Sequence, residues 1–133
     1  MGRLIEDILA TARTGLDRVE PRAAFDEMSD GAILIDTRCA DARRESGAVP
    51  GSLHIPLSVL YWRLEPSNQG DSRLADTGRR LILMCAHGYS SSLAAATLRD
   101  LGYERATDIT GGFEGWLEAG LPVEPVIEPA VAS

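Results

Sequence analysis

Short apolar runs alternate along the chain with longer segments in which apolar residues recur at helical spacing. Two runs, residues 32–35 and 81–84, are continuously apolar, which is typical of strands buried on both faces of a sheet. Residues 52–55 and 105–109 are weaker strand candidates. Because helix-forming segments separate these runs, the pattern predicts an α/β fold with a largely parallel sheet and helices on both faces.

Residues that are three or four positions apart share one face of a helix, and this spacing recurs in several segments. It predicts helices over residues 4–15, 21–28, 57–64, 90–101 and 112–119. Between them we expect a short strand at Val19, a helical turn over 41–45 and a solvated loop over 66–71. With 133 residues, the chain favours one domain. We therefore expect an N-terminal helix (residues 1–17) packed on one domain (18–122), followed by a C-terminal tail (123–133).

Composition and charge narrow the classes of partner. The formal net charge of −7 argues against nucleic acid or an anionic membrane as the main partner. No apolar run has the length of a membrane span, and the N-terminus lacks the apolar region of a signal peptide. Cys39 and Cys85 show no dithiol spacing, and His54 and His87 add too few ligands for a metal site. We expect a cytoplasmic protein with reduced thiols and no bound metal.

The residues that follow the run over 81–84 carry the strongest chemical signal. A buried strand ends at Cys85, and a small polar loop leads into a helix. The first turn of a helix has unpaired N–H groups and partial positive charge, so the pKa of Cys85 should fall below the value of about 8.5 for a free cysteine. An inert, buried thiol is the alternative. The loop favours a reactive thiol, because its residues present amides and hydroxyls rather than a core surface: Ala86, His87, Gly88, Tyr89, Ser90 and Ser91.

Four motifs in the chain resemble those of a single-domain rhodanese-type sulfurtransferase, in that family's order, over residues 18–122. They are Ile-Leu-Ile-Asp-Thr-Arg at 33–38, Gly-Ala-Val-Pro-Gly-Ser at 47–52 with His-Ile-Pro at 54–56, Cys-Ala-His-Gly-Tyr-Ser-Ser at 85–91, and Gly-Gly-Phe-Glu-Gly-Trp at 111–116. The resemblance implies a rhodanese-like α/β fold, with a central, mostly parallel five-stranded sheet flanked by helices on both faces.

The resemblance also implies a persulfide mechanism. The Cys85 thiolate attacks the outer sulfur of thiosulfate or a similar donor, sulfite leaves, and a thiol, cyanide or another protein's cysteine takes the sulfur. Backbone N–H groups of residues 86–91 hold the negative charge, and no metal or organic cofactor takes part. Cys39 is either a resolving thiol for Cys85 or an unconnected thiol. The loop has no cationic residue for an anionic donor; the arginines expected as candidates to reach it are Arg38, Arg43, Arg44 and Arg63.

Two other functions stay open. Rhodanese-like phosphatases have a loop one residue longer, closed by an arginine six positions after the cysteine, where this chain has Ser91. Without that bidentate arginine, phosphoryl transfer loses both charge and geometry. A binding or sensing module without turnover is the second alternative, although the intact cysteine and the small loop favour the enzyme.

Polar residues outside the loop have supporting roles in this interpretation. In the family, the arginine at the position of Arg38 pairs with a downstream acid, which the resemblance places at Glu45. Asp36 and Arg38 are expected to belong to the scaffold rather than to the chemistry. His87 orients the loop, donates a hydrogen bond to the leaving group, or is merely solvated, and His54 is expected to pack near the site.

Overall fold

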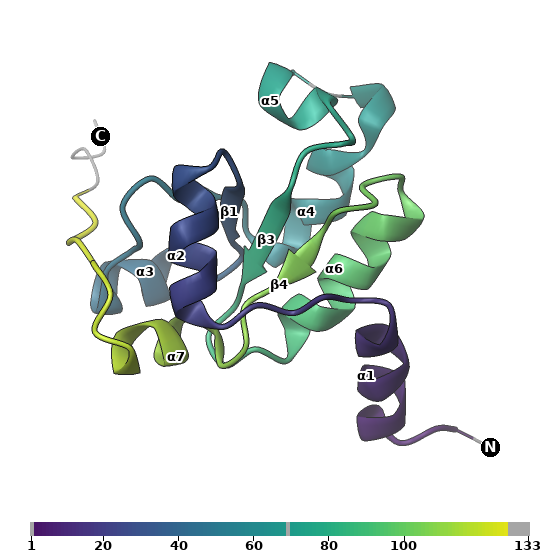
Figure 1. The fold of residues 1–133 in the computed structure, drawn as a ribbon, viewed down its shortest axis with the longest axis horizontal. Helices are drawn as coiled ribbons and strands as arrows, with labels where there is room; N and C mark the ends of the chain where they lie inside the picture. The colour runs from purple at the N-terminus through teal and green to yellow at the C-terminus, as the bar shows by residue number, and fades with distance from the viewer. Residues whose placement is uncertain (1, 69, 128–133) are drawn as a thin grey trace, which may run out of the picture.

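The computed structural model describes residues 2–68 and 70–127 and contains one parallel sheet (Figure 1). Its strands are β1 (Ile33–Asp36), β2 (Leu53–His54), β3 (Leu81–Met84) and β4 (Thr107–Asp108), in the order β2-β1-β3-β4. All pairings between these strands are parallel, with Ile33 opposite Leu81 and Asp36 opposite His54. The predicted parallel α/β architecture is therefore confirmed.

A single residue takes the place of a fifth strand, so the expected count of five is wrong for the described residues. Val19 forms an isolated parallel bridge with Ile109, beside β4. Its N–H donates to Asp108 O over 3.1 Å, and Thr110 N–H donates to Val19 O over 2.9 Å. The pairing ends there because Pro21, which fits the first turn of a helix, already starts the next element.

Helices connect and cover the strands. They are α1 (Ile5–Thr14), α2 (Pro21–Ser29), α3 (Ala40–Ser46), α4 (Leu57–Leu64), the 3-10 helix η1 (Pro66–Asn68), α5 (Ser72–Ala75), α6 (Ser90–Asp100) and α7 (Gly112–Glu118). Five of them occupy the segments where apolar spacing predicts helices, and α3 extends the predicted turn. The short helices η1 and α5 lie outside the predicted helices, because each is about one turn long and shows no apolar periodicity.

Two hydrophobic cores lie on opposite faces of the sheet, because successive strand residues point to opposite sides. One core joins β1 and β3 to α4 and α6: Ile33, Ile35, Leu81, Leu83, Leu60, Leu64, Ala94 and Leu98. The other joins the alternate strand residues to α2 and α7: Leu34, Ile82, Met84, Ala24, Phe113 and Trp116. Figure 1 shows α2 and α7 on one side of the sheet and α4 and α6 on the other.

The N-terminal helix α1 lies against α6 at the edge of the domain (Figure 1). None of its residues is buried, and Ile5 in its first turn is 63% exposed. Arg13 in its last turn donates from Nε to Ser92 Oγ over 2.9 Å and from Nη2 to Gly88 O over 2.8 Å. The helix thus reaches the loop after β3 through a charged side chain.

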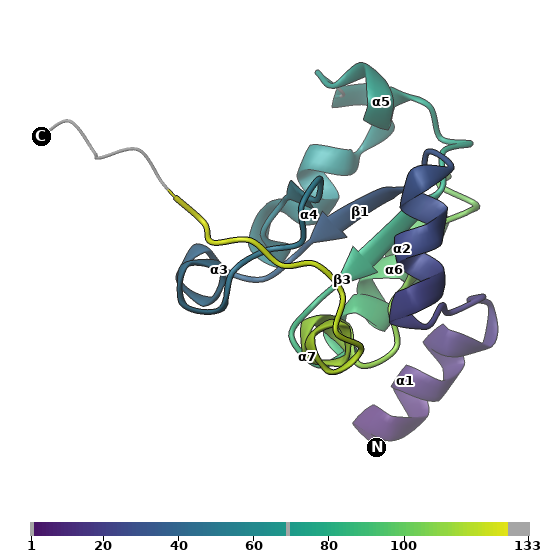
Figure 2. The ribbon, with the colours of Figure 1, turned by 60° about the vertical axis from the view of Figure 1, so that its left-hand side comes forward.

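The C-terminal segment remains attached to the domain beyond α7. Trp116 Nε1 donates to Pro122 O over 2.8 Å, and Glu124 forms an isolated antiparallel bridge with Ala48. Figure 2 shows this segment running from α7 past α3. Residues 123 and 124, in the segment expected to be a tail, are thus held on the domain, and residues 128–133 of that segment lie outside the described residues.

Candidate functional site

The carboxyl ends of β1, β3 and β4 meet at one edge of the sheet, which is where ligands bind in open parallel sheets. Cys85 is the first residue beyond β3 at this edge, and it is 7% exposed. Asp36 and Asp108 end the two strands on either side of β3, and both are fully buried. The thiol therefore lies between two strands that each end in a buried carboxylate.

Three glycines allow the loop after Cys85 to fold tightly against the start of α7. Gly88, Gly111 and Gly112 have positive φ angles of 88°, 75° and 61°. A Cβ atom on Gly112 would lie 2.4 Å from the carbonyl oxygen of Cys85, so no side chain fits there. The same carbonyl accepts a hydrogen bond from Phe113 N–H over 2.8 Å. With this carbonyl directed at α7, N–H groups of the loop face the sulfur instead.

The Cys85 sulfur has hydrogen-bond partners within its own loop. Gly88 N–H donates to Sγ over 3.1 Å, and Ser91 Oγ lies 3.3 Å from Sγ. Burial raises the pKa of Cys85, but hydrogen bonds from the side chains of Ser91 and Ser90 and from the backbone of Ser91 and Gly88 lower it by more. The pKa therefore lies below its usual value, in the direction expected from the sequence, and the loop can hold a sulfur anion.

Two arginines outside the loop bind its outer side. Arg13 of α1 and Arg18, which precedes α2, both donate to the carbonyl oxygen of Gly88, over 2.8 and 3.1 Å. Arg18 also forms a two-bond ion pair with Asp108, from Nε to Oδ1 over 2.9 Å and from Nη2 to Oδ2 over 3.2 Å. The two arginines stand 75 and 70 positions from Gly88 in the chain, so no local pattern in the sequence points to them.

The arginines expected to reach the loop have other places in the structure. Arg38 and Arg43 both bind the carboxylate of Asp36, at N···O distances of 2.9 and 3.1 Å. Arg44 pairs with Asp41, and Arg63 is an exposed residue of α4. The positive charge beside the loop is instead that of Arg13 and Arg18, because the N-terminal segment runs past the start of α6.

Arg38 has a different acidic partner from the one that the resemblance implied. It binds Asp36 rather than Glu45, because the turn after β1 lets the Asp36 side chain reach both the Arg38 guanidinium and, over 3.0 Å, the Arg38 N–H. Glu45 is exposed on α3. Arg38 also donates to Gly47 O over 2.7 Å, and its guanidinium lies 3.7 Å from the centre of the Phe113 ring. These contacts fit a scaffold role for Asp36 and Arg38.

The remaining polar residues of the expected site lie around its rim. His87 Nδ1 is 2.5 Å from Glu114 Oε2, and both side chains are largely exposed. Tyr89 is also exposed. His54 Nε2 is 2.7 Å from Arg38 O, which places it at the end of β1, near the site. Cys39 is an exposed free thiol at the start of α3.

A cavity of about 200 Å³ borders the loop on the side of α7. It is lined by Arg38, Ala42, Ser46, Ala86, His87, Phe113, Glu114 and Leu117. Apolar side chains line part of this cavity, and the exposed pair of His87 and Glu114 lines another part. A small molecule in this cavity would lie beside the first two residues that follow Cys85.

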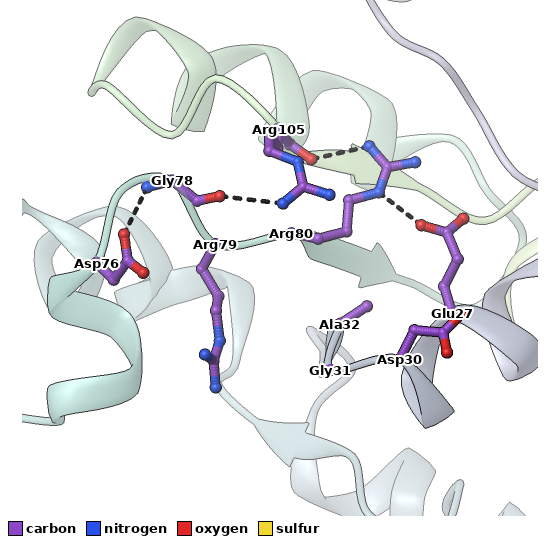
Figure 3. A pocket seen from close by; sticks show the side chains of 9 residues that line it. All are labelled: Glu27, Asp30, Gly31, Ala32, Asp76, Gly78, Arg79, Arg80 and Arg105. Atoms are coloured by element: carbon purple, nitrogen blue, oxygen red, sulfur yellow. Dashed lines mark hydrogen bonds and ion pairs between the residues drawn. The ribbon is translucent and has the colours of Figure 1, made fainter.

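A second cavity, of about 430 Å³, lies at the opposite edge of the sheet, where the strands begin (Figure 3). Its lining includes three basic and three acidic side chains: Arg79, Arg80, Arg105, Glu27, Asp30 and Asp76. Arg80 is paired with Glu27 over 2.9 Å. Because its charges balance and it lies away from Cys85, we do not assign the reaction to it.

Among residues 2–68 and 70–127, no three histidine, cysteine, aspartate or glutamate side chains are arranged to hold a metal ion. Within the same ranges, no helix has the length and apolar composition needed to cross a bilayer.

Known proteins resemble the chain in sequence and in fold. The family model described as rhodanese-like domain matches residues 21–119. Thiosulfate sulfurtransferase GlpE of Haemophilus influenzae (strain PittEE) is 35% identical over 107 residues, which cover 80% of this chain and 92% of the relative. The protein of the same name from Pseudomonas syringae is 34% identical over 103 residues, covering 77% and 89%.

Two solved structures have the same fold. A Rhodopseudomonas palustris protein of unknown function, described as a possible tyrosine phosphatase, superposes with a TM-score of 0.83 at 26% identity, covering 93% of this chain and 96% of that one. The homodimeric polysulfide-sulfur transferase of Wolinella succinogenes gives 0.74 at 23% identity, covering 91% and 87%. Because the family match spans most of the chain and includes the loop around Cys85, the chain belongs to the family of proteins with a rhodanese-like domain.

Proposed function

We propose that the protein is a sulfurtransferase that carries sulfane sulfur on Cys85 as a persulfide. The proposal is carried by the Cys85 sulfur, which lies at the end of β3, 3.1 Å from Gly88 N–H, in a loop that lowers its pKa. A thiolate is the form of cysteine that attacks sulfane sulfur. Relatives named thiosulfate sulfurtransferase, 34% and 35% identical to the chain, support the same reaction.

In the first half-reaction, the Cys85 thiolate attacks the outer sulfur of the donor. A bond forms between Sγ and that sulfur, and the bond from the outer sulfur to the sulfite group breaks. The bonding electron pair leaves with sulfite, and Cys85 becomes a persulfide. The N–H of Gly88, already 3.1 Å from Sγ, would help to hold negative charge that stays on the enzyme.

In the second half-reaction, an acceptor thiolate or cyanide attacks the outer sulfur of the persulfide. The bond between that sulfur and Sγ breaks, and Cys85 leaves as a thiolate. The conditions that lower the pKa of Cys85 make it a better leaving group as well as a more abundant nucleophile. One loop environment therefore serves both halves of a ping-pong cycle.

The proposed donor is a small anion that resembles thiosulfate, and the proposed acceptor is a thiol or a protein cysteine. Backbone N–H groups at the start of α6 provide the main anion-binding surface, because the aligned peptide dipoles place partial positive charge there. A cytoplasmic location is part of the proposal, since both cysteines are free thiols, as reducing compartments favour.

A phosphatase is the weaker candidate, although one structural relative is described as a possible tyrosine phosphatase. At the position where rhodanese-like phosphatases are expected to carry an arginine, Ser91 is fully buried. Its hydroxyl lies 2.7 Å from the carboxylate of Asp108. A serine tied to a carboxylate supplies neither the charge nor the two parallel donors that phosphoryl transfer requires.

Intact-mass spectrometry tests the proposed function. The protein is incubated with thiosulfate or polysulfide, and we expect a gain of one sulfur atom that cyanide or dithiothreitol removes. Cys39→Ser, which changes the exposed thiol, should keep the adduct, and Cys85→Ser should lose it. No adduct with either donor would favour the binding module, and an adduct on Cys85→Ser would overturn the mechanism. Rapid hydrolysis of an aryl phosphate would instead support the phosphatase.

A further inference from the structure

Asp108, at the end of β4, is a fully buried carboxylate directly behind the active-site loop. Its oxygens accept two hydrogen bonds from Arg18. Its Oδ2 atom also lies 2.7 Å from Ser91 Oγ and 2.8 Å from Ser92 Oγ. The ion pair and the two hydroxyl groups together satisfy a charge that would otherwise be costly to bury.

Ser91 stands between this carboxylate and the reactive sulfur. Its oxygen lies 2.7 Å from Asp108 Oδ2 and 3.3 Å from Cys85 Sγ. A serine hydroxyl has one proton, and an ionised carboxylate can only accept a hydrogen bond. The proton of Ser91 therefore points either to Asp108 or to Cys85, and the two groups compete for it.

The geometry favours Asp108 in this competition. An O–H donor forms its shorter and stronger hydrogen bonds with an ionised oxygen, and 2.7 Å is an ordinary length for such a bond. With its proton on that side, Ser91 turns a lone pair toward Cys85. A lone pair accepts a hydrogen bond from the neutral thiol S–H, and Ser91 lowers the pKa of Cys85 only when its proton turns from Asp108 to the thiolate.

We propose that Asp108 is a positioning residue that holds the Ser91 hydroxyl proton away from Cys85, and so limits the fraction of Cys85 that is thiolate. Ser91 then donates to the sulfur only at the expense of its bond to Asp108. The two-bond pair with Arg18 makes Asp108 an acceptor of hydrogen bonds rather than of the Cys85 proton. The inference rests on the proposed role of Cys85 as nucleophile.

Charged groups reach this part of the loop from several elements. Arg13 comes from α1, Arg18 from the segment before α2, and Asp108 from β4. His87 and Glu114 form the pair at the exposed rim. Among these groups, Asp108 is the one in contact with Ser91, so an exchange of its carboxylate for an amide should release the serine proton.

Alkylation of Cys85 by iodoacetamide tests this inference without any sulfur transfer. Rates are measured from pH 5 to 10 in a Cys39→Ser background and expressed relative to the plateau at high pH, which removes differences in access. Four proteins complete the cycle: the parent, Asp108→Asn, Ser91→Ala and the double variant. Failure of the sulfur-transfer assay would leave these rates interpretable, so the two proposals fail separately.

We expect Asp108→Asn to raise the relative rate at pH 6 about tenfold, the change in thiolate fraction for one pH unit. In the Ser91→Ala background, the same substitution should give a clearly smaller gain. Ser91→Ala alone should lower the relative rate by less than about threefold, because the parent serine gives up its bond to Asp108 whenever it donates to the thiolate. Asp17→Asn, in another carboxylate that pairs with arginine but has no contact with the described residues of the loop, is the control that should not change it.

Two results would overturn the inference. An equal gain from Asp108→Asn with and without Ser91 would mean that the carboxylate acts only through its charge. A relative rate about tenfold lower in Ser91→Ala, with Asp108 present, would mean that the serine already donates to the sulfur. The second measurement decides the question even if loss of the Arg18 pair prevents Asp108→Asn from folding.

Discussion

At the residue scale, Cys85 is a buried thiol whose surroundings nevertheless favour its anion. Burial alone would raise its pKa, and the net direction is downward only because hydroxyl and amide groups of the loop outweigh burial. Each of these donors comes from residues 88–91, three to six positions after the cysteine. The groups that lower the pKa of this residue thus come from the local chain, and Asp108 acts on the sulfur through one of them, Ser91.

The pH dependence of Cys85 alkylation tests whether the pKa of this thiol is lowered in the folded protein. A depressed pKa stabilises the folded state fully at pH values above the pKa of the unfolded thiol, and this contribution is lost as the pH falls through the folded pKa. In a Cys39→Ser protein, we expect the midpoint of the pH profile to be lower in the native state than in urea, where it should be about 8.5. Equal midpoints, or a higher native midpoint, would contradict the assigned direction.

At the element scale, the loop depends on two neighbours that hold it from opposite sides. At the start of α7, Phe113 N–H donates a hydrogen bond to the Cys85 carbonyl oxygen. From α1, the Arg13 side chain donates one to the Gly88 carbonyl oxygen. With both carbonyls bound, the loop backbone is held in the orientation in which Gly88 N–H reaches the sulfur. Changes in α7 or α1 should therefore affect Cys85 without touching it.

Gly112→Ala should disrupt the site at its contact with α7. The new Cβ atom would lie 2.4 Å from Cys85 O at a φ of 61°, so we expect a loss of about 3 kcal/mol of stability or more, and loss of the persulfide adduct. Gly120→Ala is the matched control, because its φ is also positive, at 71°, but no atom lies near its Cβ position. It should cost about 1 kcal/mol and keep the adduct. Similar losses in urea unfolding for both variants would contradict the packing argument.

Arg13→Gln should loosen the contact between α1 and the loop. It removes the charged donor to Gly88 O and Ser92 Oγ, and we expect the free energy of unfolding to fall by about 1 kcal/mol. Amide hydrogen exchange, followed by mass spectrometry, should become faster in α1 and in residues 86–91. Arg3→Gln, whose partners lie within the N-terminal segment itself, should leave exchange in the loop unchanged. Equal effects of the two substitutions would show that the contact does not hold the loop.

At the scale of the whole molecule, the apolar pattern of the sequence predicts the strands and helices well, but it does not predict which side chains pair across the fold. The bounds of β3 follow directly from its apolar run, and α4 has the predicted range, because burial on one or both faces leaves a clear pattern. The pairing of Arg18 with Asp108 joins residues 90 positions apart, and nothing near either residue indicates it. The partner of Arg38 was predicted wrongly for a related reason: the turn after β1 decides which acid the guanidinium meets.

Arg38 connects three parts of the molecule, and its removal tests how far the fold depends on that connection. It binds Asp36 at the end of β1 and Gly47 after α3, and its guanidinium lies over the Phe113 ring of α7. Arg38→Met keeps much of the side-chain volume but leaves Asp36, fully buried, with Arg43 alone. We expect the free energy of unfolding, measured in urea at pH 7, to fall by about 3 kcal/mol, since Gly47 O and the Asp36 carboxylate each lose a charged donor in a buried place.

Arg73→Met is the matched control for this substitution, because the pair of Arg73 with Asp71 is exposed to solvent. Its urea midpoint should stay close to that of the parent, since a solvated ion pair contributes little. If Arg38→Met also kept the parent midpoint, Arg43 and the surrounding packing would suffice to hold the Asp36 charge. The two edges of the site, at β1 and at α7, would then be joined by apolar contacts rather than by a buried arginine.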